Sequence, residues 1–384
     1  MLMTGLDRIA LGLVPELRGL RVGVLCNHTA IDRQGRHIVS VLREAGAVVV
    51  RSLAPEHGLW ATHQDMEPVV LDGVPRDPLL DVPVVSLYGH DATTLTPAPQ
   101  ALAGLDALVF DIRDIGARYY TYAATLAFAM RAVEPLGLPV WVCDRPNPIG
   151  PSREGPLLRP GFESFCGIVA GLPIRHGLSI GALGRWYQQA FGLATDLRII
   201  PMMEAGPAAR APIWVWPSPN MPTVETAVVY PGLCLLEGTT LSEGRGTTTP
   251  FLQWGAPGLD TRRVIADLTG RNLPGVTFLQ TRFRPAFGKH AGRICDGVFL
   301  HLADADAVHA VNLGAHILDA CRRASPDVWA WRTDAYEFVT DVPAIDLLWG
   351  STRLREAIDA GRGLAETLAE GDAEAAAFRF DAET

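Results

Sequence analysis

The chain has 384 residues, 48% of them hydrophobic and 20% charged, which is the composition of a folded protein and argues against disorder. Its 33 basic and 42 acidic residues give a net charge of −9. The basic residues form no stripe with interleaved aromatic residues, so nucleic acid is a poor partner. Because Lys289 is the single lysine, most mechanisms that use a Schiff base or a lysine nucleophile are excluded.

The six cysteines include no C-x-x-C pair of the kind that indicates zinc or a redox motif. The N-terminal residues show no basic segment followed by a long apolar stretch, and no run reaches transmembrane length. We therefore expect a cytoplasmic protein without membrane insertion, unless a leader has been removed. We expect it to be a monomer or a homodimer.

Short apolar runs rich in β-branched residues alternate with helical patterns in the first part of the chain. Strands are predicted at 21–26, 47–53, 82–89, 105–112 and 138–144, with helices at 35–46 and 119–134. Continuous apolar strands separated by helices are typical of a parallel sheet covered on both faces. The pattern predicts an α/β fold whose N-terminal domain, residues 1–150, is Rossmann-like.

The segment 144–161 is rich in proline and glycine and predicts the passage into a second domain. Beyond it we expect helices at 178–192 and 260–270, capped by Ser179 and Asp260. Strands are predicted at 276–283 and 296–304, and a last helix begins near residue 364. Residues 151–384 should therefore form a second, smaller, mixed α/β domain.

In parallel sheets of this kind, ligands bind in the crevice beyond the carboxyl ends of the strands. Polar residues stand at the end of each predicted strand, and these are Asn27, His28, Glu56, His57, Tyr88, Asp111, Arg113, Asp144 and Arg145. Neither G-x-G-x-x-G nor a P-loop with its lysine is present, so we expect the crevice to hold something other than a nucleotide.

The turn Pro55-Glu56-His57-Gly58 directly follows a predicted strand. Apolar neighbours such as Trp60 raise a carboxyl pKa by desolvating its charged form, which would suit a general acid at Glu56. The structural alternative is that Glu56 caps a helix or pairs with an arginine. His57, next to it, is a second candidate for the catalytic machinery.

Two further stretches carry residues suited to a sugar. In 110–126, the rings of Tyr119 and Tyr120 stand beside Arg118, although these tyrosines could simply pack on the sheet. The stretch 216–251 is long and dense in turn-forming residues, and loops of that length in compact domains usually bind something. Its polar residues include Asn220, Glu243 and Arg245.

A metal site would draw on His57, His63 and Asp65, or on Asp111 and Asp114. None of these sets shows a recognised spacing such as H-E-x-x-H, so we expect no metal. A metal-dependent hydrolase built on His57, His63 and Asp65 stays an alternative.

Taken together, the motifs resemble the exo-β-N-acetylmuramidases of the NamZ type, glycoside hydrolase family 171. The resemblance runs from about residue 20 to about residue 305 and weakens toward the end. It rests on these segments in this order: VLCNHTAID, PEHGLW, VVSLYG, VFDIRDIGARYYTY, CDRPNPIG, EGPLL, IRHGLSIGAL, PSPNMPT, YPGLCLLEGTTLSEGRGTTTPF and FRPAFGKHAGRICDGV.

The resemblance implies an enzyme that removes terminal N-acetylmuramic acid from the non-reducing end of peptidoglycan fragments without a cofactor. It implies an active site between two domains, with Glu56 as the general acid. The chain departs from the family in lacking a visible leader and in the composition of the loop after Trp60. A muropeptide-binding protein without turnover is an alternative from another functional class.

Glycoside cleavage also needs a group that stabilises or attacks the anomeric carbon. Asp111, Asp144 and Glu243 are candidates, as is the 2-acetamido group of the substrate itself. An arginine suits the lactyl carboxylate because its planar fork binds carboxylates in bidentate fashion. The candidates for that role are Arg118, Arg145 and Arg245, and His176 and Asn220 are expected to hold hydroxyls or the acetamido group.

Overall fold

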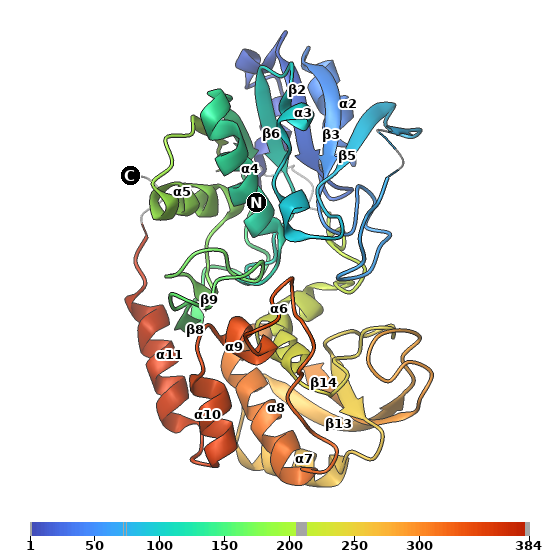
Figure 1. Ribbon diagram of the computed structural model, residues 1–384, viewed down its shortest axis with the longest axis vertical. Helices are drawn as coiled ribbons and strands as arrows, with labels where there is room; N and C mark the ends of the chain where they lie inside the picture. Colours follow the sequence, from blue (N-terminus) through green and yellow to red (C-terminus); the bar gives the residue numbers. More distant parts are fainter. Residues whose placement is uncertain (1, 72, 74, 205–212, 381–384) are drawn as a thin grey trace.

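The computed structural model describes residues 2–71, 73, 75–204 and 213–380. Residues 1, 72, 74, 205–212 and 381–384, which the expected domain ranges include, lie outside the described residues. The chain forms an upper and a lower α/β body in the view of Figure 1.

A seven-stranded sheet organises the upper body, in the order β10-β7-β6-β2-β3-β5-β4. All neighbours are parallel except β4 and β5 at one edge. The Rossmann-like α/β prediction is confirmed. The strands are β2 (Arg21–Cys26), β3 (Val48–Ala54), β4 (Arg76–Asp77), β5 (Val82–Ser86), β6 (Ala107–Asp111), β7 (Val140–Cys143) and β10 (Leu197–Ile200).

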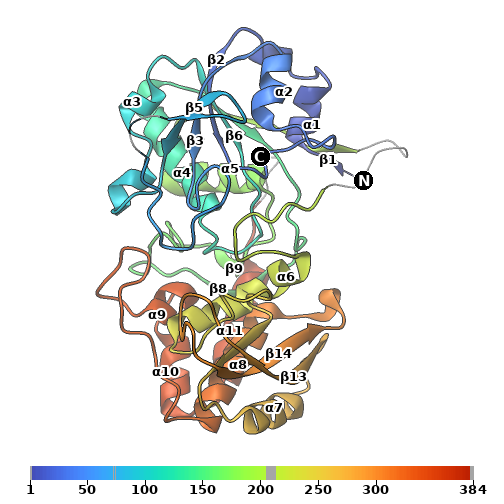
Figure 2. The ribbon, with the colours of Figure 1, turned by 90° about the vertical axis from the view of Figure 1, so that its right-hand side faces the viewer.

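Alternate residues of β6 enter two different hydrophobic clusters, one on each face of the sheet. Leu108 and Phe110 pack with α4 and α5, whereas Ala107 and Val109 pack with α1 and α2. Because both faces are covered, the strand is buried throughout, which is why it reads as a continuous apolar run. Figure 2 shows these helices, which are α1 (Gly5–Ala10), α2 (Ile38–Glu44), α4 (Tyr122–Val133) and α5 (Ile180–Phe191).

The chain leaves the upper body and returns to it before entering the lower one. After residue 150 it forms the antiparallel pair β8 (Glu154–Leu157) and β9 (Pro173–Arg175), which lies between the bodies in Figure 1. It then returns through α5, capped by Ser179 as predicted, and β10, which pairs with β7. The chain therefore passes out of the upper body more than once, and the expected boundary at residue 150 is the first of these points.

The lower body is the smaller mixed α/β unit that the sequence predicts. Its three-stranded antiparallel sheet has the order β12-β14-β13, with β12 (Gln253–Ala256), β13 (Val276–Phe283) and β14 (Cys295–Leu302). Asp260 caps α7 as predicted. The helices are α6 (Val224–Leu233), α7 (Thr261–Gly270), α8 (Ala310–Ala324), α9 (Ala344–Trp349), α10 (Arg353–Ala360) and α11 (Ala365–Ala377).

Shorter elements complete the chain. Strand β1 (Leu2–Met3) pairs with β11 (Met203–Glu204), and α3 (Pro99–Leu102) precedes β6. The 3-10 turns are η1 (Pro15–Leu17), η2 (Ala92–Leu95), η3 (Glu134–Leu136), η4 (Cys234–Gly238) and η5 (Ala305–Ala307). The turn η4 matters most for function because it continues α6 and carries Glu237.

Helices α6 and α8 approach each other through two glycines. A Cβ on Gly232 would lie 1.7 Å from the carbonyl oxygen of Ala310, and one on Gly314 would lie 2.1 Å from the carbonyl oxygen of Gly232. No side chain fits there without moving the backbone. Since η4 follows α6 directly, this contact also sets the position of Glu237.

We predict that Gly232→Ala lowers the free energy of unfolding by about 3 kcal/mol, because overpacked cores must shift backbone or side chains. Gly270→Ala is the matched control, since a Cβ there meets nothing within 4 Å and alanine favours helix. Urea unfolding followed by circular dichroism measures both variants. Equal stability of the two would contradict the close-packing argument.

Candidate active site

A small cavity of about 30 Å³ lies where the carboxyl end of β3 meets the lower body. It adjoins a larger open pocket of about 520 Å³, with which it shares Asp65, Glu237 and Arg245. The cavity is lined by Glu56, His57, Asp65, Tyr119, Tyr120, Thr121, Ser218, Asn220, Met221, Tyr230, Glu237, Arg245, Phe251, Tyr336 and Glu337. Both bodies therefore contribute side chains to one site.

The turn after β3 brings Glu56 into this cavity. His57 and Gly58 both have left-handed backbone conformations, with φ of 66° and 81°, which reverse the chain immediately after Glu56. The left-handed region is unfavourable for histidine, so its contacts must hold it there. His57 Nδ1 lies 2.9 Å from the carbonyl oxygen of His63, and its ring packs edge-on against Tyr122. His57 thus braces the turn that presents Glu56.

Hydrogen-bond donors surround the Glu56 carboxyl, which is buried. The Thr121 hydroxyl, at the start of α4, donates to Oε2 at 2.5 Å, and the Met66 N–H points at Oε1 from 3.5 Å. Burial and then the charge of Glu56 raise the pKa of Tyr88, whose hydroxyl also hydrogen-bonds this carboxyl. Donors of this kind stabilise the ionised form of a carboxyl group.

A second carboxyl, Glu337, lines the same cavity from the lower body. It lies in a tight turn closed by the bridge between Tyr336 and Val339, with left-handed φ of 47° at Glu337 and 69° at Phe338. Its side chain is buried, and its Oε2 has no hydrogen-bond partner among the described residues. Burial raises the pKa of Glu337 well above its ordinary value, and the nearby charge of Glu56 raises it further.

Arg245 is the cation at the centre of the site. It contacts Glu237 at 2.7 Å, Asp65 at 3.2 Å and Glu243 at 3.6 Å, and its guanidinium lies 5.0 Å from the ring centre of Phe251. Burial alone would lower the pKa of Arg245, but the facing carboxylates raise it well above its ordinary value. The charge of this arginine is therefore already balanced within the protein.

The carboxylates around Arg245 have further partners. Burial would raise the pKa of Glu237, but Arg245 and the Tyr336 hydroxyl, which donates to Oε2 at 2.6 Å, lower it. Lys289 Nζ lies 3.0 Å from Glu243 Oε2, in the larger pocket. Glu237 and Glu243 thus both neutralise cations.

Seven of the catalytic and substrate-binding candidates named from the sequence reach the site. Tyr119 lines the cavity, but its hydroxyl donates to the carbonyl of Pro231. Asn220 donates to Gln64 Oε1 at 2.8 Å. Those in the cavity are Glu56, His57, Tyr119, Tyr120, Asn220 and Arg245, while Glu243 lies in the adjoining pocket.

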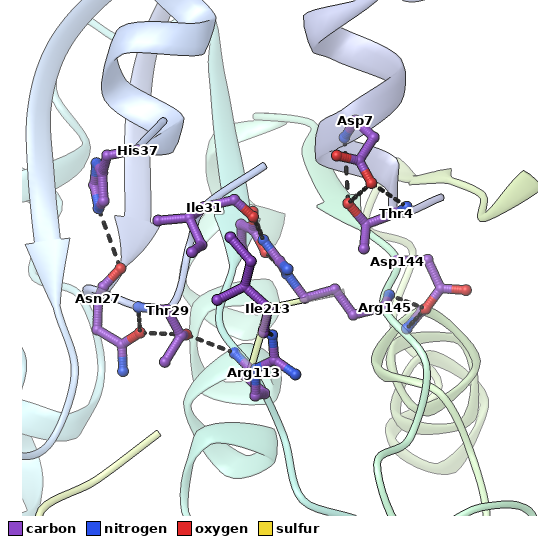
Figure 3. Close-up of polar contacts among 12 residues, drawn as sticks. Thr4, Asp7, Asn27, Thr29, Ile31, His37, Arg113, Asp144, Arg145 and Ile213 are labelled. Carbon is purple, nitrogen blue, oxygen red and sulfur yellow. Dashed lines mark hydrogen bonds and ion pairs between the residues drawn. The ribbon is translucent and has the colours of Figure 1, made fainter. Parts of the chain in front are cut away.

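Other strand-end residues form a buried polar network away from the cavity, part of which Figure 3 shows. Arg145 binds Asp111 in bidentate fashion, with Nε donating to Oδ1 and Nη2 donating to Oδ2 at 2.7 Å. Asp144 accepts from the Gly181 N–H at 2.8 Å and so caps α5. Asn27 Oδ1 accepts from both the hydroxyl and the N–H of Thr29. These side chains bind one another because buried ionic and polar groups need partners.

Arg118 and His176 also serve the fold. Arg118 donates to the carbonyls of Pro156, Leu172 and Leu348 at 2.7–3.0 Å, which ties the start of α4 to the β8–β9 pair and to α9. His176 Nε2 lies 3.3 Å from Asp114 Oδ2 in the interior. The structure brings neither residue to the cavity.

Sequence reasoning did not single out Tyr336 or Glu337, and it considered Asp65 only for a metal. The segment 326–343, which carries the first two, has no helix or strand. The long-loop argument that drew attention to 216–251 applies to this segment equally. The length of this segment without regular structure is the feature that could have drawn attention to Tyr336 and Glu337.

Among the described residues, no group of three or more His, Cys, Asp and Glu side chains is arranged to hold a metal ion. In the same part of the chain, no helix is both long and apolar enough to cross a membrane.

Comparisons with known proteins cover nearly the whole chain. The N-terminal family model of exo-β-N-acetylmuramidase NamZ matches residues 22–225, and its C-terminal model matches residues 228–383. The chain is 37% identical over 365 residues to the peptidoglycan β-N-acetylmuramidase NamZ of Bacillus subtilis (strain 168), covering 93% of this chain and 84% of that protein.

Two crystal structures of DUF1343 family proteins from Bacteroides fragilis NCTC 9343 have the same fold. Both are 26% identical to this chain, with TM-scores of 0.82 and 0.75. The first match covers 96% of this chain and 94% of the other, and the second covers 98% and 96%. The two family models meet just after residue 225, at the start of α6, where the lower body begins.

We predict that Glu337→Gln stabilises the protein increasingly as the pH rises. A carboxyl with a raised pKa keeps its proton in the folded chain but loses it in the unfolded chain once the pH exceeds about 4.3. Above that value, up to the raised pKa, the free energy of unfolding of the wild type therefore falls by about 1.4 kcal/mol per pH unit relative to the non-titrating variant.

Urea unfolding of both proteins at several pH values from 4 to 8 measures this difference. The exposed Glu366→Gln variant is the control, and its stability should differ from that of the wild type equally little at every pH. A Glu337→Gln variant that gains nothing on going from pH 4 to pH 8 would contradict the raised pKa.

Proposed function

The chain belongs to the exo-β-N-acetylmuramidase NamZ family, and on that premise we propose that it releases terminal N-acetylmuramic acid from the non-reducing end of peptidoglycan fragments. The observation that carries the proposal is the cavity in which Glu56, from the family motif PEHGLW, faces a second buried carboxyl. Two carboxyl groups flanking one bond are what most glycoside hydrolases require.

An exo mode of action fits the shape of the site. The cavity holding Glu56 and Glu337 is too small for a sugar ring, whereas the adjoining pocket of about 520 Å³ has the size of a typical small-molecule site. Trp331 and Phe287 line this pocket and offer apolar surface to a ring face. We propose that one terminal sugar occupies the pocket, with its glycosidic bond directed to the carboxyl pair.

Residues at the cavity wall have separate proposed roles. Glu56 is a catalytic carboxyl, and His57 holds the turn that positions it. Tyr120 and Asn220 face the cavity and are proposed to contact sugar hydroxyls or the acetamido group. Asp111 and Arg145 receive no proposed role in substrate binding, because they neutralise each other in the interior.

The lactyl carboxylate of the substrate requires a cation whose charge is not already balanced. Arg245 faces three carboxylates, so we propose that it organises the site and that Arg332 meets the substrate. Arg332 lines the larger pocket, stacks 5.1 Å above Tyr336 and donates to the carbonyl of Ala335. Within the described part of the chain it has no carboxylate at ion-pair distance, which leaves its charge for a ligand.

We predict that the wild type releases nitrophenol from the nitrophenyl β-glycoside of N-acetylmuramic acid and that Glu56→Gln lowers kcat/KM by about 1,000-fold, as expected on loss of an ionisable catalytic group. Release of nitrophenol is followed by absorbance. A wild type inactive on both muramic acid and glucosamine glycosides would overturn the proposed function. Tight binding of muramic acid without turnover would instead favour a binding protein.

We predict that Arg332→Gln lowers kcat/KM for the muramic acid glycoside by about 30-fold, the worth of a charge-assisted hydrogen bond. The same variant should leave the value for the matching N-acetylglucosamine glycoside within about 3-fold, since that sugar has no carboxylate. Arg262→Gln, on the exposed side of α7, is the control. An equal loss on both substrates would assign Arg332 to structure.

A further inference from the structure

The two carboxyl groups of the cavity have opposite surroundings. Glu56 comes from the upper body and accepts hydrogen bonds on both of its oxygens, from Thr121 and from the Met66 N–H. Glu337 comes from the lower body, and its Oε2 finds no donor among the described residues. A buried oxygen without a donor is costly as a carboxylate but not as the O–H of a carboxylic acid that points toward a ligand.

The charges that face each carboxyl reinforce the difference. Glu337 is faced by Glu56, Glu237 and Asp65, and the cation that acts on it, Arg245, is shared among Asp65, Glu237 and Glu243. Tyr336, next to Glu337, directs its hydroxyl to Glu237 instead. Among the described residues, Glu337 thus has no donor for its Oε2 and no cation at ion-pair distance, both of which an ionised Glu337 would need.

Two like charges at one small site do not both ionise, and their environments decide which one keeps the proton. The raised pKa of Glu337 agrees with this direction. Glu237 is a third buried carboxyl of the cavity, but Arg245 and Tyr336 hold it in its charged form. Glu337 is therefore the member of the group whose surroundings favour the neutral acid.

We infer that Glu337 is the proton donor of the reaction and that Glu56 is the carboxylate that faces the anomeric carbon. This inference rests on the proposed function and replaces the general-acid role expected for Glu56 from the sequence. It makes the loop from the lower body a catalytic element. It also explains why the chain holds two consecutive residues, Glu337 and Phe338, in the left-handed conformation.

The chemical step balances without any further reactant. The O–H proton of Glu337 moves to the glycosidic oxygen while the bond from that oxygen to the anomeric carbon breaks, and the bonding electron pair stays on the oxygen. The leaving sugar departs as an alcohol, and the positive charge at the anomeric carbon faces the Glu56 carboxylate. Water then adds to that carbon, and its proton passes to the Glu337 carboxylate, which restores the acid.

The test compares two leaving groups, because a good leaving group departs without being protonated. Wild type, Glu337→Gln and Glu56→Gln are each assayed on the nitrophenyl β-glycoside of N-acetylmuramic acid and on the disaccharide of N-acetylmuramic acid linked to N-acetylglucosamine. For Glu337→Gln we expect a loss of about 1,000-fold on the disaccharide and of less than about 10-fold on the nitrophenyl glycoside. For Glu56→Gln we expect a large loss on both.

The pH dependence gives a second readout that a structural role would not move. On the nitrophenyl glycoside, the fall in kcat/KM at high pH should disappear in Glu337→Gln, because no acid is left to ionise, and should persist in the exposed control Glu366→Gln. Circular dichroism and unfolding curves confirm that each variant is folded.

Each result bears on one claim only. Equal losses on both substrates for Glu337→Gln, or a leaving-group dependence found in Glu56→Gln instead, would overturn the inference and leave the proposed function intact. A wild type without activity on either substrate would overturn the proposed function itself.

Discussion

The contact of Arg245 with Asp65 and Glu237 is the interaction on which the site depends. Asp65 follows the turn after β3 in the upper body, whereas Arg245 and Glu237 belong to the lower one, so the ion pairs join the two bodies at the cavity. Because little of the Arg245 or Glu237 side chain is exposed, removal of either one would leave the charge of the other without this partner in the interior. The same set leaves Glu337 without a free cation, so the interaction that holds the bodies together also favours a proton on that carboxyl.

The upper body uses its ionisable residues in a different way. At the ends of β6 and β7, Asp111 and Arg145 neutralise each other, and Asp144 caps α5. The guanidinium of Arg118 donates hydrogen bonds to backbone carbonyls of segments outside the sheet. These contacts connect the strand ends to α5 and to segments outside the sheet. Of the strand-end turns, the one after β3 brings a carboxyl group, that of Glu56, into the cavity shared with the lower body.

The parts of the structure that follow from local pattern could be predicted, and the parts set by distant packing could not. The central strands could be predicted because both faces of a parallel sheet are covered, which makes each strand a continuous apolar run. The caps Ser179 and Asp260 could be predicted because capping residues lie next to the helix that they cap. Strand β10 carries no such signal, since its burial alternates over four residues. Nor does periodicity tell which polar strand-end residues pair with one another. Glu337 meets Glu56 only because two bodies pack together, which no short-range pattern encodes.

The return of the chain through α5 and β10 also constrains how the molecule is made. Strand β7 is synthesised well before β10, its only neighbour on that side of the sheet. Until residue 200 has left the ribosome, the hydrogen-bonding edge of β7 is open, and open edges invite pairing with other chains. The β8–β9 pair is synthesised in that interval and finds its partner α11 only after the lower sheet and helices α6 to α10 have been made. The nascent protein therefore carries an open strand edge until β10 is made, and an uncovered β8–β9 pair for longer, until α11 is made.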